Sequence, residues 1–237
     1  MNKTLQKLIN LIDQLLIWEQ RCILCADKSR QQVCSQCLTS LQPQRQLPRC
    51  PRCLIYLPPK EIRCKNCQDN HFYFERIIAA CEYTFPLTHV LHQLKYYNRL
   101  EYSRGLSQIF YRRLVAQLTH LPDLMIPVPL HITRQRQRGF NQALELVREF
   151  HNHYPQIQLA QATRIKATQS QATLNRIQRL HNLENAFAIN VNLENKHVAL
   201  IDDVVTTGTT VNELARLCKQ RGARQVDIWC LMRANHD

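Results

Sequence analysis

The stretch Val198-Ala-Leu-Ile-Asp-Asp-Val-Val-Thr-Thr-Gly-Thr-Thr210 decides how this sequence is interpreted. Its four apolar residues predict a buried strand that ends at two carboxylates, Asp202 and Asp203. Two valines and the hydroxyl-rich turn Thr206–Thr210 follow, and apolar residues at helical spacing after the turn predict a helix. Backbone N–H groups at a helix N-terminus attract anions. The stretch therefore predicts a phosphate-binding turn beside an acidic pair.

The chemistry of the turn separates it from other nucleotide-binding loops. Its threonine hydroxyls add donors, and Gly208 lets the backbone approach a ligand closely. A nucleoside-triphosphate loop would end in Gly-Lys-Ser/Thr, and a dinucleotide fingerprint would carry more glycines. Adjacent carboxylates at the end of a strand suit two vicinal ribose hydroxyls, or a magnesium ion bound through water. The order of these features favours a ribose phosphate over an ordinary strand–turn–helix with an acidic turn.

From about residue 75 onward, short apolar runs alternate with helical patterns. The runs predict strands at 77–81, 124–128, 197–201 and 226–230, with helices around 87–97, 103–118, 140–153 and 210–221. Such alternation is typical of an α/β domain with a mostly parallel sheet flanked by helices. Residues 164–182 are polar and basic without a clear pattern, which favours a long functional loop. We expect one domain over residues 75–237.

Eight of the 11 cysteines form four Cys-x-x-Cys pairs. The pairs are Cys22 and Cys25, Cys34 and Cys37, Cys50 and Cys53, and Cys64 and Cys67. Two such pairs offer four thiolates to a tetrahedral zinc ion, so sequential pairing gives two closed, structural sites. An interleaved pairing of the same ligands stays open. We expect a small double zinc ribbon at 22–74 that folds on binding zinc, and core positions for the other three cysteines, Cys81, Cys218 and Cys230.

The chain is strongly basic and has no membrane-spanning pattern. Its 31 basic and 18 acidic side chains give a formal net charge of +13, which favours an anionic partner over a merely solvated surface. Residues 1–21 predict an amphipathic helix, and packing of its apolar stripe on the protein is favoured over contact with a membrane. We find no secretory signal and no apolar stretch of ~20 residues. Many cysteines without a signal indicate a reducing compartment, so we expect a cytoplasmic protein.

The Val198–Thr210 stretch resembles the signature of type I phosphoribosyltransferases. The resemblance implies the fold of that class. It also implies that Asp202 and Asp203 hold the ribose hydroxyls of phosphoribosyl pyrophosphate (PRPP), which these proteins use with Mg²⁺. The 5′-phosphate would then lie on the turn, made of Thr206, Thr207, Gly208, Thr209 and Thr210. The 164–182 segment resembles the mobile loop that closes over this site and excludes water.

Further elements narrow the resemblance to one family. They are Pro127-Val-Pro-Leu130, Arg134-x-x-x-Arg138-Gly-Phe-Asn-Gln142, Thr168-x-x-Gln171-x-x-Leu174 and Arg179-x-x-Asn182-x-x-x-Ala186-Phe187. Together with the cysteine pairs they are similar to the ComF family, which joins a double zinc ribbon to a phosphoribosyltransferase domain. The match extends from Cys22 to Arg233. It implies a competence role, in uptake or handling of single-stranded transforming DNA, with PRPP or a phosphoribosylated small molecule and competence-machinery proteins as partners.

A bound PRPP needs cations for its pyrophosphate. Arg134 and Arg138 follow the 124–128 strand directly, and we expect them to act with the acidic pair in catalysis. Lys95, in Gln93-Leu-Lys-Tyr-Tyr97, resembles a family element and is a further PRPP-binding candidate. Four aromatic residues are weaker candidates for stacking on bases, because isolated aromatics are more often core: Tyr96, Tyr97, Phe140 and His181.

Two classes of function stay open. One is an enzyme that transfers phosphoribose to an unidentified acceptor, either in DNA handling or in nucleotide and base metabolism. The other is a catalytically silent module that senses PRPP or grips DNA. The intact acidic pair and turn favour PRPP binding, whereas no sequence feature identifies a base pocket. The sequence therefore supports the ligand more strongly than the reaction.

Overall fold

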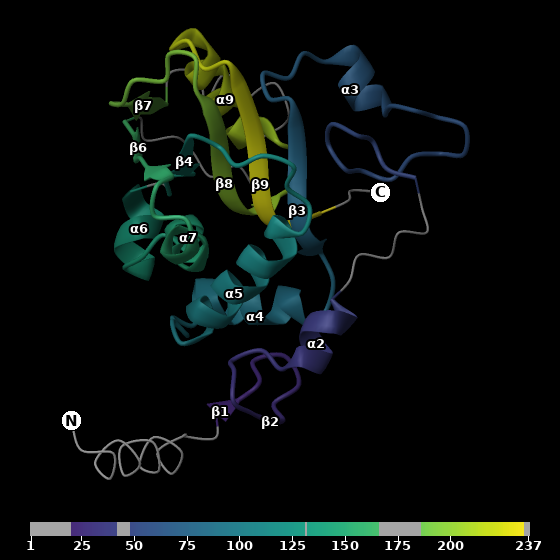
Figure 1. Ribbon diagram of the computed structural model, residues 1–237, viewed down its shortest axis with the longest axis vertical. Coiled ribbons are helices and arrows are strands. Elements are labelled where there is room, and N and C mark those ends of the chain that lie inside the picture. The colour runs from purple at the N-terminus through teal and green to yellow at the C-terminus, as the bar shows by residue number, and fades with distance from the viewer. Residues whose placement is uncertain (1–19, 42–47, 131, 166–185, 235–237) are drawn as a thin grey trace, which may run out of the picture.

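The computed structural model describes residues 20–41, 48–130, 132–165 and 186–234 (Figure 1). The amphipathic helix predicted at 1–21 lies almost wholly outside these ranges. So does most of the 164–182 segment, including His181 and the family elements from Thr168 to Asn182.

A five-stranded parallel sheet forms the centre of the protein, in the order β3-β9-β8-β4-β5. The strands are β3 (Arg76–Glu82), β4 (Leu124–Pro127), β5 (Gln158–Leu159), β8 (His197–Val205) and β9 (Gln225–Arg233). All four predicted strands form, and β5 adds a short edge strand that the sequence analysis missed. Strands β8 and β9 are buried along nearly their whole length, as expected where both faces of a parallel sheet are covered.

Helices cover both faces of the sheet (Figure 1). Three of them share one buried layer: α4 (Leu87–Tyr96), α5 (Tyr102–Val115) and α7 (Gln142–His153). The opposite layer contains α9 (Thr209–Gln220). Because side chains alternate along a strand, Trp229 of β9 lies in the first layer, whereas Ile228 and Cys230 lie in the second. These are the four predicted helices.

Helix α6 (Ile132–Arg138) was not predicted. It buries no residue, so its sequence has no apolar stripe from which a helix could be recognised. A short antiparallel pair, β6 (Ala162–Arg164) and β7 (Phe187–Ile189), was also missed. No helix among the described residues is long and apolar enough to cross a bilayer.

The two halves of the cysteine-rich region pack on opposite faces of the sheet. The first half contains β1 (Gln20–Arg21), β2 (Lys28–Ser29) and α2 (Ser35–Ser40). Its Val33 belongs to the layer of α5, where Gly105 leaves room for Ile23: an added Cβ would lie 2.5 Å from Ile23 Cδ1.

The second half, with α3 (Lys65–Asp69), belongs to the layer of α9. In Figure 1 α2 and α3 accordingly lie far apart. Each half therefore shares a core with the sheet. The domain boundary between residues 74 and 75 stays a prediction. The three remaining cysteines are buried, which confirms them as core residues: Cys81, Cys218 and Cys230.

Candidate functional site

Strand β8 carries the acidic pair past the point where its neighbour β4 ends. The pairing with β4 stops at Pro127 opposite Ile201, whereas the pairing with β9 continues to Val205. Asp202 and Asp203 therefore lie within the strand, and not just after it as the sequence analysis expected. In the sheet, β5 lies on the outer side of β4, whereas β9 lies on the opposite side of β8, so the strand order runs outward in both directions from between β4 and β8. Ligands of open α/β sheets bind at such a switch in strand order.

A cavity of about 530 Å³ opens at this switch point. It is lined by residues that follow β3 and β4, by the end of β8 and the turn after it, and by side chains of α4, α6 and β6. Seven predicted site residues line it: Lys95, Arg134, Arg138, Asp202, Asp203, Thr206 and Thr210. The other three, Thr207, Gly208 and Thr209, belong to the turn itself and are not among the lining residues. The fold thus brings the acidic pair and the candidate cations to one place.

The turn between β8 and α9 has the features of an anion site. Gly208 caps α9 in the left-handed region, with φ 79° and ψ 2°. A Cβ added there would have no atom within 4 Å, so the space beside the turn is open. Thr207 Oγ1 lies 2.9 Å from Thr209 Oγ1 and accepts the Thr209 N–H at 3.4 Å. The first N–H groups of a helix lack intrahelical acceptors, and the helix dipole adds positive charge. The turn fits a phosphate.

The acidic pair is partly neutralised by Lys95, whose Nζ lies 2.9 Å from Asp203 Oδ1. Asp202 Oδ1 accepts the backbone N–H of Asp203 at 2.8 Å. Burial, and after it the negative charge of Asp203, raises the pKa of Asp202 to about 8, although Lys95 acts in the opposite direction. Asp202 is therefore a much weaker acid than an ordinary aspartate, and a ligand that binds its carboxylate form favours release of its proton.

The raised pKa predicts how stability depends on pH. An unfolded aspartate has a pKa of ~3.9. Between about pH 4 and about pH 8 the folded protein thus binds more protons at Asp202 than the unfolded chain, and this contribution to stability falls as pH rises. An Asp202→Asn variant cannot ionise, so its stability relative to the wild type is expected to increase with pH across this window. Urea unfolding of both proteins at pH 5 and pH 8 measures the difference, and identical pH slopes would contradict it.

Four cations meet the two carboxylates in the cavity. Arg134 and Arg138 come from α6, Lys95 from α4 and Arg164 from β6. The Arg138 guanidinium lies 5.2 Å from the ring centre of Tyr96 and donates to Gln142 Oε1 at 3.2 Å. Burial, together with the charge of Arg134, lowers the pKa of Arg164. This excess of positive charge favours a ligand with several negative charges.

Several cavity residues were missed by the sequence analysis. Tyr83 follows β3, whereas Thr88 and His92 lie on α4, with His92 one turn before Lys95. Only the position of β3 in the sheet brings them to the site, and no motif marks them. Of the aromatic candidates, Tyr96 lines the cavity, whereas Phe140 is half-buried against the core.

The cysteines form two groups of four, and both have the size of a tetrahedral metal site. Within each group all sulfur atoms lie within 4.8 Å of one another. Cys25 Sγ lies 3.9 Å from Cys34 Sγ, and Cys53 Sγ lies 3.5 Å from Cys64 Sγ. Four thiolates at about 2.3 Å from a zinc ion would lie about 3.8 Å apart. The groups contain the sequential pairs, which excludes the interleaved arrangement: Cys22, Cys25, Cys34 and Cys37, and Cys50, Cys53, Cys64 and Cys67.

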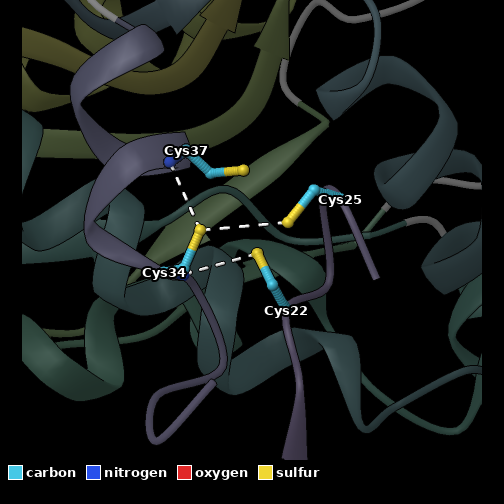
Figure 2. A group of neighbouring side chains, drawn as sticks. All are labelled: Cys22, Cys25, Cys34 and Cys37. Atoms are coloured by element: carbon cyan, nitrogen blue, oxygen red, sulfur yellow. Dashed lines mark hydrogen bonds between the residues drawn. The ribbon is translucent and has the colours of Figure 1, made fainter. Parts of the chain in front are cut away.

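A short helix begins at one cysteine of each group. Figure 2 shows the first group, in which Cys34 caps α2 and its sulfur accepts the N–H of Cys37 at 3.4 Å. In the second group Cys64 caps α3 in the same way.

The groups differ in burial, because Cys25 is exposed whereas the second group is wholly buried. Burial alone would raise the pKa of Cys50, but backbone N–H groups lower it to about 6, which favours a thiolate ligand.

Known proteins are similar to both halves of the chain. Residues 125–237 match the phosphoribosyl transferase domain family. The protein named DNA utilization protein YhgH from Escherichia coli (strain K12) is 34% identical over 210 residues, covering 85% of this chain and 90% of that protein. Competence protein F from Haemophilus influenzae is 32% identical over 225 residues, covering 90% and 97%. Competence protein ComFC from Bacillus subtilis is 31% identical over 114 residues, covering 47% and 45%. With near full-length relatives of this kind and a phosphoribosyltransferase fold, the chain belongs to the ComF family of competence-related proteins.

Proposed function

We propose that this protein binds PRPP with Mg²⁺ in the cavity between β4 and β8, and that it acts in the handling of single-stranded transforming DNA. The observation that carries the proposal is the convergence of an acidic pair, a phosphate-type turn and four cations in one cavity. PRPP offers a matching set of groups: two vicinal hydroxyls, a 5′-phosphate and a pyrophosphate. We place the protein in the cytoplasm, where cysteines stay reduced.

Each part of PRPP has a counterpart in the cavity. The 5′-phosphate fits the turn from Thr206 to Thr210, and the ribose hydroxyls fit Asp202 and Asp203. The pyrophosphate fits Arg134 and Arg138 on α6. The acidic pair could alternatively hold Mg²⁺, which would supply charge neutralisation of the leaving group.

In a phosphoribosyl transfer, the bond between the anomeric carbon and pyrophosphate breaks as the acceptor bonds to that carbon. Positive charge develops on the ribose ring in the transition state. Asp202 and Asp203 would stabilise it electrostatically, while Arg134 and Arg138 orient and neutralise the departing pyrophosphate. Such a reaction needs no protein nucleophile, since positioning and electrostatics supply the catalysis.

The arginines of α6 provide a matched test of PRPP binding. Arg134 and Arg138 line the cavity, whereas Arg136, on the same exposed helix, does not. Loss of a charge-assisted hydrogen bond costs about 1.5–3 kcal/mol. Arg134→Gln and Arg138→Gln are therefore expected to weaken PRPP binding by about 10- to 100-fold. Arg136→Gln should bind like the wild type.

Isothermal titration calorimetry with Mg²⁺ and PRPP measures all four dissociation constants. Failure of the wild type to bind PRPP would refute the proposal. An equal loss in all three variants would show that general surface charge, and not this cavity, attracts the ligand.

An exposed aromatic surface beside the cavity favours DNA as the second ligand. It consists of Phe85, just before α4, of His89, His92 and Tyr96 on α4, and of Tyr97, just after α4. Ring centres lie 6.5 Å apart for Phe85 and His89, and 4.7 Å apart for His92 and Tyr96. Phe85 is 79% exposed and Tyr96 is 64% exposed. Aromatic rings next to cations are the two elements of single-strand binding, because bases stack and the backbone needs positive charge.

Tyr96 provides the test of this surface. Removing one stacking ring costs about 1–3 kcal/mol, so Tyr96→Ala is expected to weaken binding of a labelled single-stranded oligonucleotide by at least about 5-fold. Tyr96→Phe keeps the ring and should keep the affinity. Fluorescence anisotropy over a range of salt concentrations measures both variants. An affinity that does not fall with salt, or equal losses in the two variants, would contradict DNA binding here.

Release of pyrophosphate separates this function from its alternatives. Release from PRPP in the presence of single-stranded DNA supports the proposed role. Release with free nucleobases alone would instead indicate an enzyme of nucleotide metabolism. Tight PRPP binding without release under either condition would indicate a sensor.

We also propose zinc as the metal of both cysteine groups, because tetrahedral four-thiolate sites of this size favour it. With four protein ligands each, both sites are closed to substrate, and their role is structural.

A further inference from the structure

Arg233, the last residue of β9, is a buried cation whose bonds reach two distant parts of the chain. Its side chain is only 5% exposed. Its Nε donates to the carbonyl oxygen of Cys53 at 2.8 Å, and its Nη1 donates to the carbonyl oxygen of Val205 at 2.9 Å. Nη1 also donates to the carbonyls of Thr206 and Ala234. None of the ion pairs among the described residues includes Arg233.

Burial of the Arg233 guanidinium costs free energy that its hydrogen bonds must offset. A buried guanidinium without a carboxylate loses its hydration, and only well-directed carbonyl oxygens offset that loss. An apolar side chain of similar length would avoid the penalty altogether. What Arg233 supplies beyond packing is a fixed fork of donors. One branch bonds to Cys53 of the second cysteine group, and the other bonds to Val205 and Thr206, where β8 meets the Thr206–Thr210 turn (the phosphate turn).

A second contact joins the same two regions. The backbone N–H of Tyr73, six residues after Cys67, donates to Asn212 Oδ1 at 2.8 Å. Asn212 lies in the first turns of α9, and its own N–H donates to the carbonyl of Gly208 at 2.9 Å. The phosphate turn is thus held at its start through Arg233 and at its end through Asn212. The partners of these two bonds, Cys53 and Tyr73, belong to or follow the second cysteine group. The first group packs on the opposite face of the sheet.

We propose that Arg233 is a positioning residue: it couples the backbone conformation of the second cysteine group to that of the phosphate turn. A metal in that group fixes the backbone of Cys53, Cys53 fixes the guanidinium, and the guanidinium holds Val205 and Thr206 where the turn begins. Metal in the second group therefore strengthens PRPP binding, although no ligand of that metal lines the cavity. This consequence for PRPP rests on the function proposed above. The effect on the turn itself does not.

Hydrogen exchange measured by mass spectrometry tests the effect on the turn without any ligand. Arg233→Met removes the donors and keeps an unbranched buried side chain. In residues 206–212 the amides of Thr209 and Asn212 are hydrogen-bonded, and we expect their exchange to become at least about 10-fold faster, since each bond to a charged donor contributes about 1.5–3 kcal/mol. Amides in residues 198–201 of β8 serve as the reference for global opening and should keep their protection.

Arg49 offers a matched control. It also anchors the second cysteine segment, since it donates to the carbonyl of Leu54 at 3.2 Å and pairs with Glu82, but it does not contact the turn. Arg49→Met should leave exchange in residues 206–212 at the wild-type rate. Exchange in Arg233→Met within 2-fold of the wild type, or an equal acceleration in Arg49→Met, would overturn the proposal.

Asn212 keeps the proposal testable should Arg233→Met fail to fold. Asn212→Ala removes the acceptor of the Tyr73 N–H and is expected to accelerate exchange of the turn. Asn212→Asp keeps an acceptor oxygen and should restore protection, whereas Asn212→Leu keeps the volume without the acceptor and should not. Equal exchange in Asn212→Ala and Asn212→Asp would refute the second contact as a link.

Metal removal completes the test. Chelation is expected to accelerate exchange of residues 206–212 in the wild type far more than in Arg233→Met, where the link is already cut. Equal acceleration in both proteins would refute transmission through Arg233. PRPP affinity should fall about 10-fold in Arg233→Met with metal content unchanged. If the wild type does not bind PRPP at all, the proposed function fails, while the exchange results still decide this inference.

Discussion

The double replacement Asp202→Asn and Asp203→Asn is expected to weaken PRPP binding by at least about 100-fold. Each carboxylate that accepts a ribose hydroxyl contributes about 1.5–3 kcal/mol, so losing both costs about 3–6 kcal/mol. The amides keep the size of the side chains. They also remove the carboxyl group whose pKa burial raises, which offsets the loss of the ion pair between Asp203 and Lys95, so we expect the variant to stay folded. Calorimetry with Mg²⁺ and PRPP measures the loss.

A second acidic position provides the control for this prediction. Glu101 is exposed, pairs with Arg99 and lies outside the cavity. Glu101→Gln should bind PRPP like the wild type, and thermal unfolding should show that both variants are folded. A dissociation constant for the double variant within about 3-fold of the wild-type value would remove the acidic pair from the ligand site.

Loss of one ligand from the second cysteine group is expected to destabilise the whole domain. Cys67 is 4% exposed and belongs to the core layer of α9. Structural zinc contributes about 10–16 kcal/mol to the folding of isolated zinc fingers. A loss of only about 4 kcal/mol from a protein of this size would lower Tm by about 10 °C. Cys67→Ser should therefore lose one metal ion per chain and unfold at a markedly lower temperature.

Cys25→Ser is the matched variant in the first group. Cys25 is exposed, and its unit packs on α5 from outside. We expect it to lose one metal ion as well, with a smaller fall in the Tm of the sheet. Elemental analysis and differential scanning calorimetry check both variants. Equal falls in Tm, or two metal ions retained after either substitution, would contradict the different roles assigned to the two groups.

Much of the fold and of the site could be predicted because the relevant signals are local. The strand of β8, the turn and the start of α9 are consecutive in the chain, so their order alone indicates an anion site. The cysteine pairs carry their own spacing, which predicted the metal-ligand sets, while their sequential grouping needed the structure. Helices α4, α5, α7 and α9 each have an apolar face, and this periodicity is visible without any knowledge of tertiary contacts.

What could not be predicted depends on partners far along the chain. Strand β8 extends to Val205 because β9 continues beside it, and no property of Asp202 or Asp203 indicates this extension. Helix α6 has no buried face and hence no periodic pattern. Arg233 reads in the sequence as one basic residue among many. Its positioning role depends on hydrogen bonds to the carbonyl groups of Cys53 and Val205, which only the folded chain brings close to it.

The position of β3 at the edge of the sheet has a consequence for biosynthesis. Among the described strands β3 is the first of the central sheet to leave the ribosome, yet its only partner is β9, the last. The bond from Arg233 to Cys53 likewise spans 180 residues. Contacts of such long range form late and make folding slow. The second cysteine segment therefore lacks its contacts with β9 and Arg233 until translation has passed residue 233.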